Sequence, residues 1–314
     1  MSTVPVNVDN FVRAETDRMF ANLLAGADDS HWLHFREPVP LDHQTVIRMN
    51  RDTLYSAAIV DTREGVVITI PDSGDRYLSV MVVNQDHYIN QVLHDPGVHT
   101  LSAEQVGAPY ALIAARILVD PADPEDVKAV NALQDKLGVT TPSNRPFVMP
   151  EYEEASFNDT REALLALARG LDGYSHSFGR EDAVDPVRHL IGSASGWGGL
   201  PEYEAFYVNV EPGLPVAEYK LIVPKDVPVD AFWSISVYNA DGYFEPNDRQ
   251  ANTLNSITAQ RETDGSVIVH FGGCDDDRAN CLPIVEGWNY LVRLYRPHPE
   301  VIDGSWQFPS IESA

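Results

Sequence analysis

Residues 77–88 read YLSVMVVNQDHY, and residues 232–243 read FWSISVYNADGY. The two stretches are identical at five of twelve positions, and 155 residues separate them (232 − 77), close to half of the 314-residue chain. Alternate positions are apolar in both copies, which indicates β-strands with one face in a core. These positions are Leu78, Val80 and Val82 in the first copy and Trp233, Ile235 and Val237 in the second. We therefore predict that the chain contains two copies of one β domain.

Strand-like segments surround both copies, and helix-like segments are concentrated between them. Strands are predicted at 45–49, 53–60, 66–70, 76–84 and 110–119, and again at 205–210, 218–223, 232–239, 266–271 and 290–295. The turn at 71–75 predicts a hairpin between the strands 66–70 and 76–84. Helices are predicted at 9–25 and between 124 and 191, all before residue 200.

This order of elements predicts a mainly β fold with helical segments, organised as two tandem jelly-roll-like antiparallel β-sandwich domains that arose by internal duplication. The predicted boundaries are an N-terminal helix and lead-in at 1–44, a first β domain at 45–120, a helical connector at 121–201 and a second β domain at 202–314.

The chain is strongly acidic, with 47 Asp and Glu against 22 Lys and Arg and a formal net charge of −25. Phosphate binding needs clustered Lys and Arg, so nucleic acid and anionic membranes are excluded as partners. No apolar run reaches 18 residues, and the N-terminal sequence MSTVPVNVDN has neither a basic patch nor an apolar stretch. We therefore expect a cytoplasmic protein that binds a small molecule, and a homo-oligomer is a further possibility.

Cys274 and Cys281 are the only two cysteines, and six residues separate them. Two cysteines cannot form a disulfide framework, and a cytoplasmic location favours free thiols. A single bridge that closes this short loop is the alternative. The sequence has no zinc-type Cys/His spacing and no phosphate-binding glycine motif, so neither a metal nor an organic cofactor is predicted.

Two groups of motifs resemble a known pair of bacterial domains. The run NRDTLYS at 50–56, followed by Pro71 and by DRY at 75–77, resembles domain of unknown function twelve-fifty-four. FWSISVYN at 232–239, DGS at 264–266, RLYRP at 293–297 and DGSW at 303–306 resemble its usual partner, domain twelve-fourteen. The resemblance implies two jelly-roll-like β domains in tandem, and it brings no established reaction. One departure is NCLP at 280–283, where the family pattern has Asn-Trp-Leu-Pro.

The triplet Asn50-Arg51-Asp52 opens an otherwise apolar strand-like run. Strand alternation would send Arg51 and Tyr55 to one face and Asp52 to the other, unless the strand begins after Asp52. In one interpretation Asp52 is buried beside an arginine, Arg76 or Arg293, and fixes the strand register. In the other, Asp52 is a general base and Arg51 and Tyr55 bind a ligand.

Other polar residues stand at the ends or on the outer faces of predicted strands. Arg293 lies in an apolar strand and therefore needs a carboxylate or an anionic ligand. Asn84 and Asn239 each end a copy of the repeated strand, and we predict that both amides bond local backbone. His87, His94 and His99 lie close together with Asp86 and Asp95, but their spacing matches no metal motif.

These observations lead to two hypotheses about function. The first is an enzyme without an organic cofactor that acts by acid–base chemistry on a small polar or carbohydrate-like molecule. Its catalytic residues would be Asp52, Tyr55 and His87, and its ligand-binding residues would be Arg51, Asn84, Tyr238 and Arg293. The second is a non-catalytic ligand-binding or assembly module in which the same residues are structural. Co-location of Asp52, Tyr55 and His87 in one pocket would distinguish the first from the second.

Overall fold

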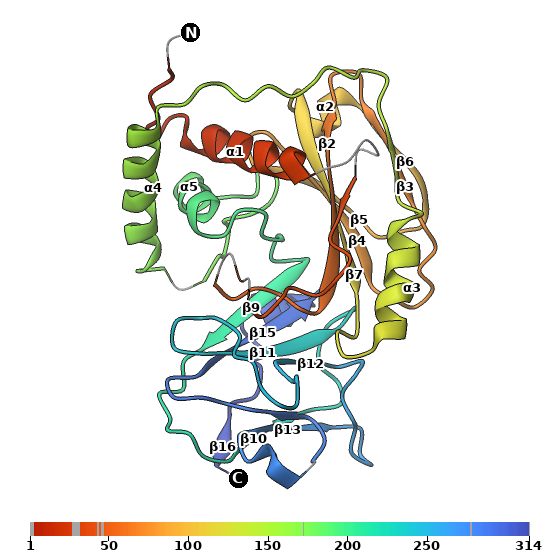
Figure 1. The fold of residues 1–314 in the computed structure, drawn as a ribbon, viewed down its shortest axis with the longest axis vertical. Coiled ribbons are helices and arrows are strands. Elements are labelled where there is room, and N and C mark those ends of the chain that lie inside the picture. The colour runs from red at the N-terminus through yellow and green to blue at the C-terminus, as the bar shows by residue number, and fades with distance from the viewer. Residues whose placement is uncertain are drawn as a thin grey trace. The chain divides into compact units, whose positions relative to one another are not determined.

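A computed structural model describes residues 3–26, 32–42, 44, 47–171, 173–276 and 278–313. The chain forms two compact units (Figure 1). Unit 1 contains Met1–Arg36, Leu54–Leu118 and Lys128–Glu202, and unit 2 contains Glu37–Thr53, Val119–Val127 and Tyr203–Ala314. Two short segments from the N-terminal half of the sequence, 37–53 and 119–127, therefore belong to the C-terminal unit.

Unit 1 contains two sheets. The larger has the order β1 (Leu33–His34), β2 (Thr53–Asp61), β7 (Tyr110–Leu118), β4 (Leu78–Asn84) and β5 (Ile89–Leu93). The smaller has the order β6 (Gly97–Leu101), β3 (Val66–Ile70) and β8 (Gly138–Thr140). β4 pairs antiparallel with β5 and β7, and β3 pairs antiparallel with β6 and β8.

Unit 2 also contains two sheets. One has the order β12 (Thr253–Asn255), β11 (Trp233–Tyr238), β15 (Asn289–Tyr295) and β9 (Ala205–Val210). The other has the order β14 (Cys281–Leu282), β13 (Val267–Phe271), β10 (Tyr219–Val223) and β16 (Glu312–Ser313). Inward-facing residues of β10, β11, β13 and β15 form one buried core, so the two sheets pack as a sandwich.

The two units repeat one strand order. In chain order, β2, β3, β4, β5, β6 and β7 of unit 1 correspond to β9, β10, β11, β12, β13 and β15 of unit 2. The sheet order β2-β7-β4-β5 matches β9-β15-β11-β12, and the neighbours β6-β3 match β13-β10. The predicted mainly β fold with helical segments is therefore confirmed, and the duplication has a topological counterpart. The jelly-roll topology in the strict sense stays a prediction.

The helices lie mainly in unit 1. α1 (Phe11–Gly26), α4 (Glu154–Ala168) and α5 (Pro186–Ser195) share a small apolar core (Figure 1). Two further helices flank β7 in the sequence, with α2 (Ala103–Val106) before it and α3 (Pro124–Gln134) after it. A short helix, α6 (Pro299–Ile302), lies beyond residue 200, where we predicted none. It begins with a proline, a residue that is favoured in the first turn of a helix. No described helix is both long and apolar enough to cross a membrane.

One predicted strand and one predicted hairpin are absent from the described part of the structure. Of the predicted strand 45–49, Thr45 and Val46 lie outside the described residues, and residues 47–49 form a turn and irregular structure. Arg48 has φ = 54°, a left-handed conformation that interrupts a strand. The segment 71–75 is not a hairpin turn either, because β3 and β4 lie in different sheets. Alternation identifies a strand, but it does not identify the partner of that strand.

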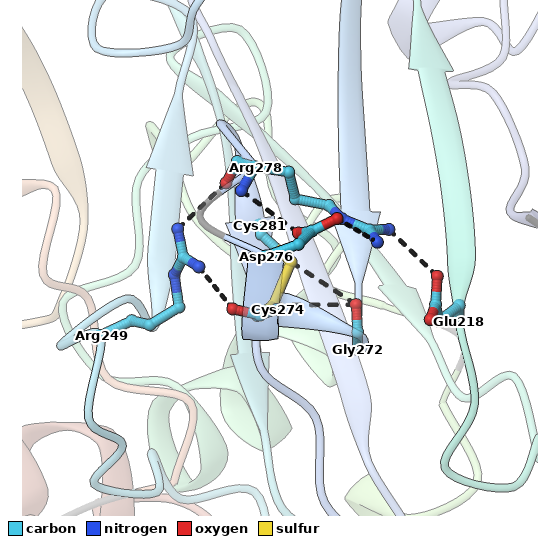
Figure 2. A network of polar contacts seen from close by, with 7 residues as sticks. All are labelled: Glu218, Arg249, Gly272, Cys274, Asp276, Arg278 and Cys281. Atoms are coloured by element: carbon cyan, nitrogen blue, oxygen red, sulfur yellow. Dashed lines mark hydrogen bonds and ion pairs between the residues drawn. A yellow bond between two sulfur atoms is a disulfide. The ribbon is translucent and has the colours of Figure 1, made fainter.

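The prediction of free thiols is wrong, because Cys274 and Cys281 form a disulfide (Figure 2). The 3₁₀ turn η1 (Cys274–Asp276) and the left-handed Gly272 and Gly273 bend the chain back on itself. The two Cα atoms are consequently 5.7 Å apart, a separation that a disulfide can span.

Candidate functional site

The polar face of β11 is buried inside unit 2. Ser234, Ser236 and Tyr238 alternate with the core residues of this strand, and all six residues of β11 are buried. The 37–53 segment contacts this face, since Ser234 Oγ donates to Asp52 Oδ2 (2.6 Å) and the Tyr238 hydroxyl donates to the Met49 carbonyl (2.8 Å). These hydroxyls are therefore satisfied by the chain itself.

Asp52 and Arg293 bring opposite charges into this buried face, with exposed fractions of 0% and 3%. Thr253 Oγ1 donates to Asp52 Oδ1 (2.8 Å) and lies 3.2 Å from Ser236 Oγ, which accepts from Arg293 Nη1 (2.8 Å). Two hydroxyls thus connect the charges, which form no direct ion pair among the described residues. Burial raises the pKa of Asp52 above 3.8, and Arg293 and the hydroxyl donors offset part of that effect.

The second terminal nitrogen of Arg293 holds the 37–53 segment. Arg293 Nη2 donates to the carbonyls of Arg48 and Met49 and to the Tyr238 hydroxyl, at 2.9, 3.2 and 2.9 Å. Burial by itself lowers the pKa of Arg293, but the neighbouring tyrosines and Asp52 more than offset this effect, so the net shift is upward. The guanidinium is therefore a permanent charge that binds four oxygen atoms of unit 2, those of Ser236, Tyr238, Arg48 and Met49.

The Asn50-Arg51-Asp52 triplet precedes the strand, because β2 begins at Thr53. Asn50 Oδ1 accepts from the Asp52 N–H (2.7 Å), and Asn50 Nδ2 donates to the Tyr295 hydroxyl (2.8 Å). Arg51 donates to the Val39 carbonyl, and burial lowers its pKa. All three side chains thus bond groups of unit 2. This geometry favours the interpretation that Asp52 holds the fold, and its role as a general base stays a prediction.

Arg293 has an equivalent in unit 1 that sequence comparison missed. The register of β11 with β15 pairs Ser234 with Arg293, and the register of β4 with β7 pairs Ser79 with Arg116. Each serine occupies the third position of its copy of the repeated stretch, so the two arginines occupy the same place in the duplicated sheet. The two arginines are 177 residues apart (293 − 116), whereas the repeated stretches are offset by 155, so the alignment of those stretches does not pair them.

The environments of the two arginines differ. Arg293 is buried, whereas Arg116 is half-buried. Arg116 Nη2 donates to the Gly198 carbonyl (2.7 Å), and its guanidinium carbon lies 5.5 Å from the centre of the Tyr55 ring. That distance permits a cation–π interaction. Tyr55 is itself half-buried, and no described residue forms a hydrogen bond with its hydroxyl.

His87 lies in a buried network of unit 1, with an exposed fraction of 0%. Its Nε2 accepts from the Gly198 N–H (2.9 Å), so the proton is on Nδ1, which donates to Ser193 Oγ (2.9 Å). The Ser193 hydroxyl donates in turn to the His189 carbonyl (2.8 Å). Burial, reinforced by His189, lowers the pKa of His87 well below 6.5. Because His87 donates to Ser193 and does not accept from it, the pair lacks the arrangement of a nucleophile and its base.

Stacked rings surround this imidazole. The ring of His87 stacks on Trp197 and on His189, with ring centres 5.4 Å apart in both pairs, and His189 stacks on Tyr88 at 4.7 Å. His87 also has φ = 61°, a left-handed conformation. The three predicted catalytic residues are divided between the units, with Asp52 in unit 2 and Tyr55 and His87 in unit 1. Their catalytic roles stay predictions.

The other histidines near His87 bond backbone groups. His94 Nδ1 lies 3.2 Å from the Leu78 carbonyl, and His99 Nε2 lies 2.8 Å from the Asp95 carbonyl. Asp86 accepts from Arg13 through both carboxylate oxygens. Within the described ranges, no three His, Cys, Asp or Glu side chains gather in a way that could hold a metal ion.

Asn84 and Asn239 build the same turn in the two copies. The Asn84 Oδ1 accepts from the N–H groups of Asp86 and Tyr88, at 2.9 and 3.0 Å. Asn239 Oδ1 accepts from the N–H groups two and four residues further on, at 3.1 and 2.9 Å. The prediction that both amides bond local backbone is therefore confirmed. The amide of Asn84 also donates to the Val106 carbonyl (3.1 Å), and its predicted ligand-binding role stays a prediction.

Replacing either asparagine with alanine should lower the free energy of unfolding by about 1 kcal/mol, because the turn N–H groups lose their acceptor. Urea unfolding of Asn84→Ala and Asn239→Ala measures this loss. Asn158→Ala, at an exposed position of α4, is the control, and we expect a change within about 0.5 kcal/mol. Unchanged stability of both turn variants would contradict the assignment.

Comparison with known families agrees with the motifs. Residues 30–98 match the family model "Protein of unknown function (DUF1254)", and residues 213–299 match "Protein of unknown function (DUF1214)". The predicted pair of tandem domains, with twelve-fifty-four in the N-terminal half and twelve-fourteen in the C-terminal half, is therefore confirmed. No curated protein matches the chain.

Solved structures share the fold at low sequence identity. The crystal structure of the VPA0106 protein from Vibrio parahaemolyticus matches with a TM-score of 0.71 and 18% identity, over 98% of this chain and all of the other. An uncharacterised protein from Burkholderia cenocepacia matches with a TM-score of 0.53 and 14% identity, over 97% of this chain and 88% of the other. At these identities the likeness concerns the fold alone.

Proposed function

We propose that this protein is a non-catalytic binding module for a small polar or carbohydrate-like molecule, and that the ligand contacts Tyr55 on the sheet of unit 1. The observation that carries the proposal is the state of the predicted site residues. Most of the predicted site residues are buried, and their polar atoms form hydrogen bonds within the protein: Asp52, His87, Asn84, Tyr238 and Arg293. Among the predicted site residues, only Tyr55 combines a half-buried ring with a hydroxyl that no described residue bonds.

The surroundings of Tyr55 suit recognition of such a molecule. A binding site of this kind combines an apolar or aromatic surface with a few placed polar groups. The Tyr55 ring supplies the aromatic surface, its hydroxyl can donate or accept, and the Arg116 guanidinium lies against the ring. The duplication supports this choice of copy, because the equivalent arginine of unit 2 is enclosed by the 37–53 segment.

The geometry does not favour acid–base catalysis. A general base must reach a substrate proton directly or through one water. The Asp52 carboxylate accepts from Ser234 and Thr253, and both ring nitrogens of His87 are occupied by Gly198 and Ser193. A binding function needs neither group, so it agrees with these contacts.

The test is a thermal-shift screen of the full chain with neutral monosaccharides, sugar acids and short mono- and dicarboxylates. A ligand present at 100 times its Kd stabilises a protein by about 2.7 kcal/mol. We expect at least one class to raise the Tm, and Tyr55→Phe to weaken its binding roughly fivefold through the loss of one hydrogen bond. Tyr88→Phe, which alters another half-buried tyrosine of unit 1, should bind like the wild type. A full screen without a shift, or equal binding by Tyr55→Phe, would refute the proposal.

A further inference from the structure

The Cys274–Cys281 bridge lies at an edge of the β14-β13-β10-β16 sheet (Figure 2). β14 is only two residues long and runs parallel to β13. Its backbone is held by two bonds, from the His270 N–H to the Asn280 carbonyl (2.9 Å) and from the Gly272 N–H to the Leu282 carbonyl (3.0 Å). Cys274 is half-buried, whereas Cys281 is buried, so Cys274 is the more accessible residue of the pair.

The register of the two strands places His270 directly beside Cys281. The His270 Nδ1 is buried and has no hydrogen-bond partner among the residues that the structure describes. Burial lowers the pKa of His270, and Arg278 lowers it further, which favours the neutral imidazole. A buried polar atom without a hydrogen-bond partner lowers the stability of a protein. The form of the protein with the Cys274–Cys281 disulfide is therefore destabilised by the unpaired Nδ1.

Hydrogen bonds and ion pairs also hold this loop in place, independently of the disulfide. Arg249 donates to the carbonyls of Cys274 and Arg278. The Arg278 side chain bonds Asp276 through two nitrogens, at 2.7 Å each, and Glu218 through the third, at 3.1 Å (Figure 2). After reduction these contacts keep the two sulfurs close together, so the bridge can form again.

We propose that Cys274–Cys281 is a site of reversible thiol–disulfide exchange with a dithiol reductant, and that His270 favours the reduced form. One thiolate of the reductant attacks Cys274 Sγ, the bond to Cys281 breaks, and Cys281 leaves and takes up a proton. The second thiol of the reductant then closes a disulfide within the reductant and releases Cys274 as a thiol. Two electrons and two protons pass to the protein. The Cys281 sulfur becomes the partner that His270 Nδ1 lacks in the oxidised form.

The test equilibrates the folded full chain with graded ratios of reduced to oxidised dithiothreitol. Acid quenching, alkylation and mass spectrometry then give the fraction of open bridges. We expect the native wild type to be reduced while its near-ultraviolet circular dichroism stays unchanged. His270→Phe removes the polar atom, and the ratio at half-reduction should move about tenfold toward more reducing conditions. His270→Leu repeats the test with a smaller side chain.

His99→Phe is the matched control, because this half-buried histidine bonds the Asp95 carbonyl in unit 1, whereas both cysteines belong to unit 2. It should leave the midpoint unchanged. A bridge that opens only after the wild type has been unfolded would overturn the proposal. Midpoints of both His270 variants equal to that of the wild type would overturn the role of His270.

Discussion

Replacing Arg293 with methionine is expected to lower the free energy of unfolding by about 3–5 kcal/mol, because the change leaves the Asp52 carboxylate buried without its opposite charge. The change also removes the hydrogen bonds that the guanidinium donates to Ser236 Oγ and to the carbonyls of Arg48 and Met49. Chemical denaturation measures the loss. Arg296→Met is the matched control. This exposed arginine follows the end of the same strand, and its ion pair with Asp230 (3.7 Å) contributes at most about 1 kcal/mol.

A second substitution separates the lost charge from the lost packing. In the Arg293→Met background, Asp52→Asn removes the uncompensated carboxylate, so the double variant should be more stable than Arg293→Met alone. The two residues then show a coupling energy, as groups of one network do. A double variant that is less stable by the sum of both single losses would contradict the charge network.

The stability of the Arg293→Met variant is also expected to depend on pH. Burial raises the pKa of Asp52 above its ordinary 3.8, and without Arg293 the main opposing influence is gone. The folded state then binds a proton more readily than the unfolded chain, so stability is full below the ordinary pKa and falls as pH rises through the folded-state value. Urea unfolding of Arg293→Met between pH 4 and pH 7 should therefore show a larger decline than that of Arg296→Met.

Replacing His87 with alanine is expected to cost about 3–5 kcal/mol, because the change leaves a cavity between stacked rings and removes two hydrogen bonds. The ring contacts Trp197 and His189, and its nitrogens bond Ser193 and Gly198. Thermal and urea unfolding measure the effect. His176→Ala is the matched control, since His176 also has a left-handed backbone (φ = 58°) but an exposed side chain. The control should change stability by about 0.5 kcal/mol or less.

A glycine variant isolates the backbone contribution at this position. The repeated stretch places Gly242 (φ = 85°) where the first copy has His87 (φ = 61°). Because alanine is disfavoured in this conformation, His87→Gly should be as stable as His87→Ala, or up to about 1 kcal/mol more stable. Retained stability of His87→Ala would show that the network is dispensable, and the catalytic prediction for His87 would then regain support.

Much of the fold was predictable from the sequence because its signals are local. The alternation of Leu78, Val80 and Val82 and of the equivalent apolar positions in β11 identifies a strand from a few neighbouring residues. β3 and β9 begin and end at the residues predicted, since β-branched and aromatic runs between turn residues define such strands. The turns at Asn84 and Asn239 were predictable for the same reason, because each amide bonds groups two and four residues away.

The candidate site was less predictable, because its contacts join residues far apart in the chain. Asp52 bonds Ser234 across 182 positions and Thr253 across 201. The sequence indicated that Asp52 and Arg293 need partners, but it did not show that hydroxyls connect them. Nor did it show that Ser193 and Gly198 occupy both nitrogens of His87.

By itself, the sequence determined the positions and faces of several main strands, the internal repeat and the pair of domains, because side-chain pattern and composition are properties of the chain. Only the tertiary structure decided that the 37–53 segment completes unit 2, that Cys274 and Cys281 join, and that Arg116 is the counterpart of Arg293. Those outcomes depend on which surfaces meet after folding. Burial and hydrogen-bond partners also depend on those surfaces, so the sequence alone did not show which groups of the protein Asp52 and His87 bond.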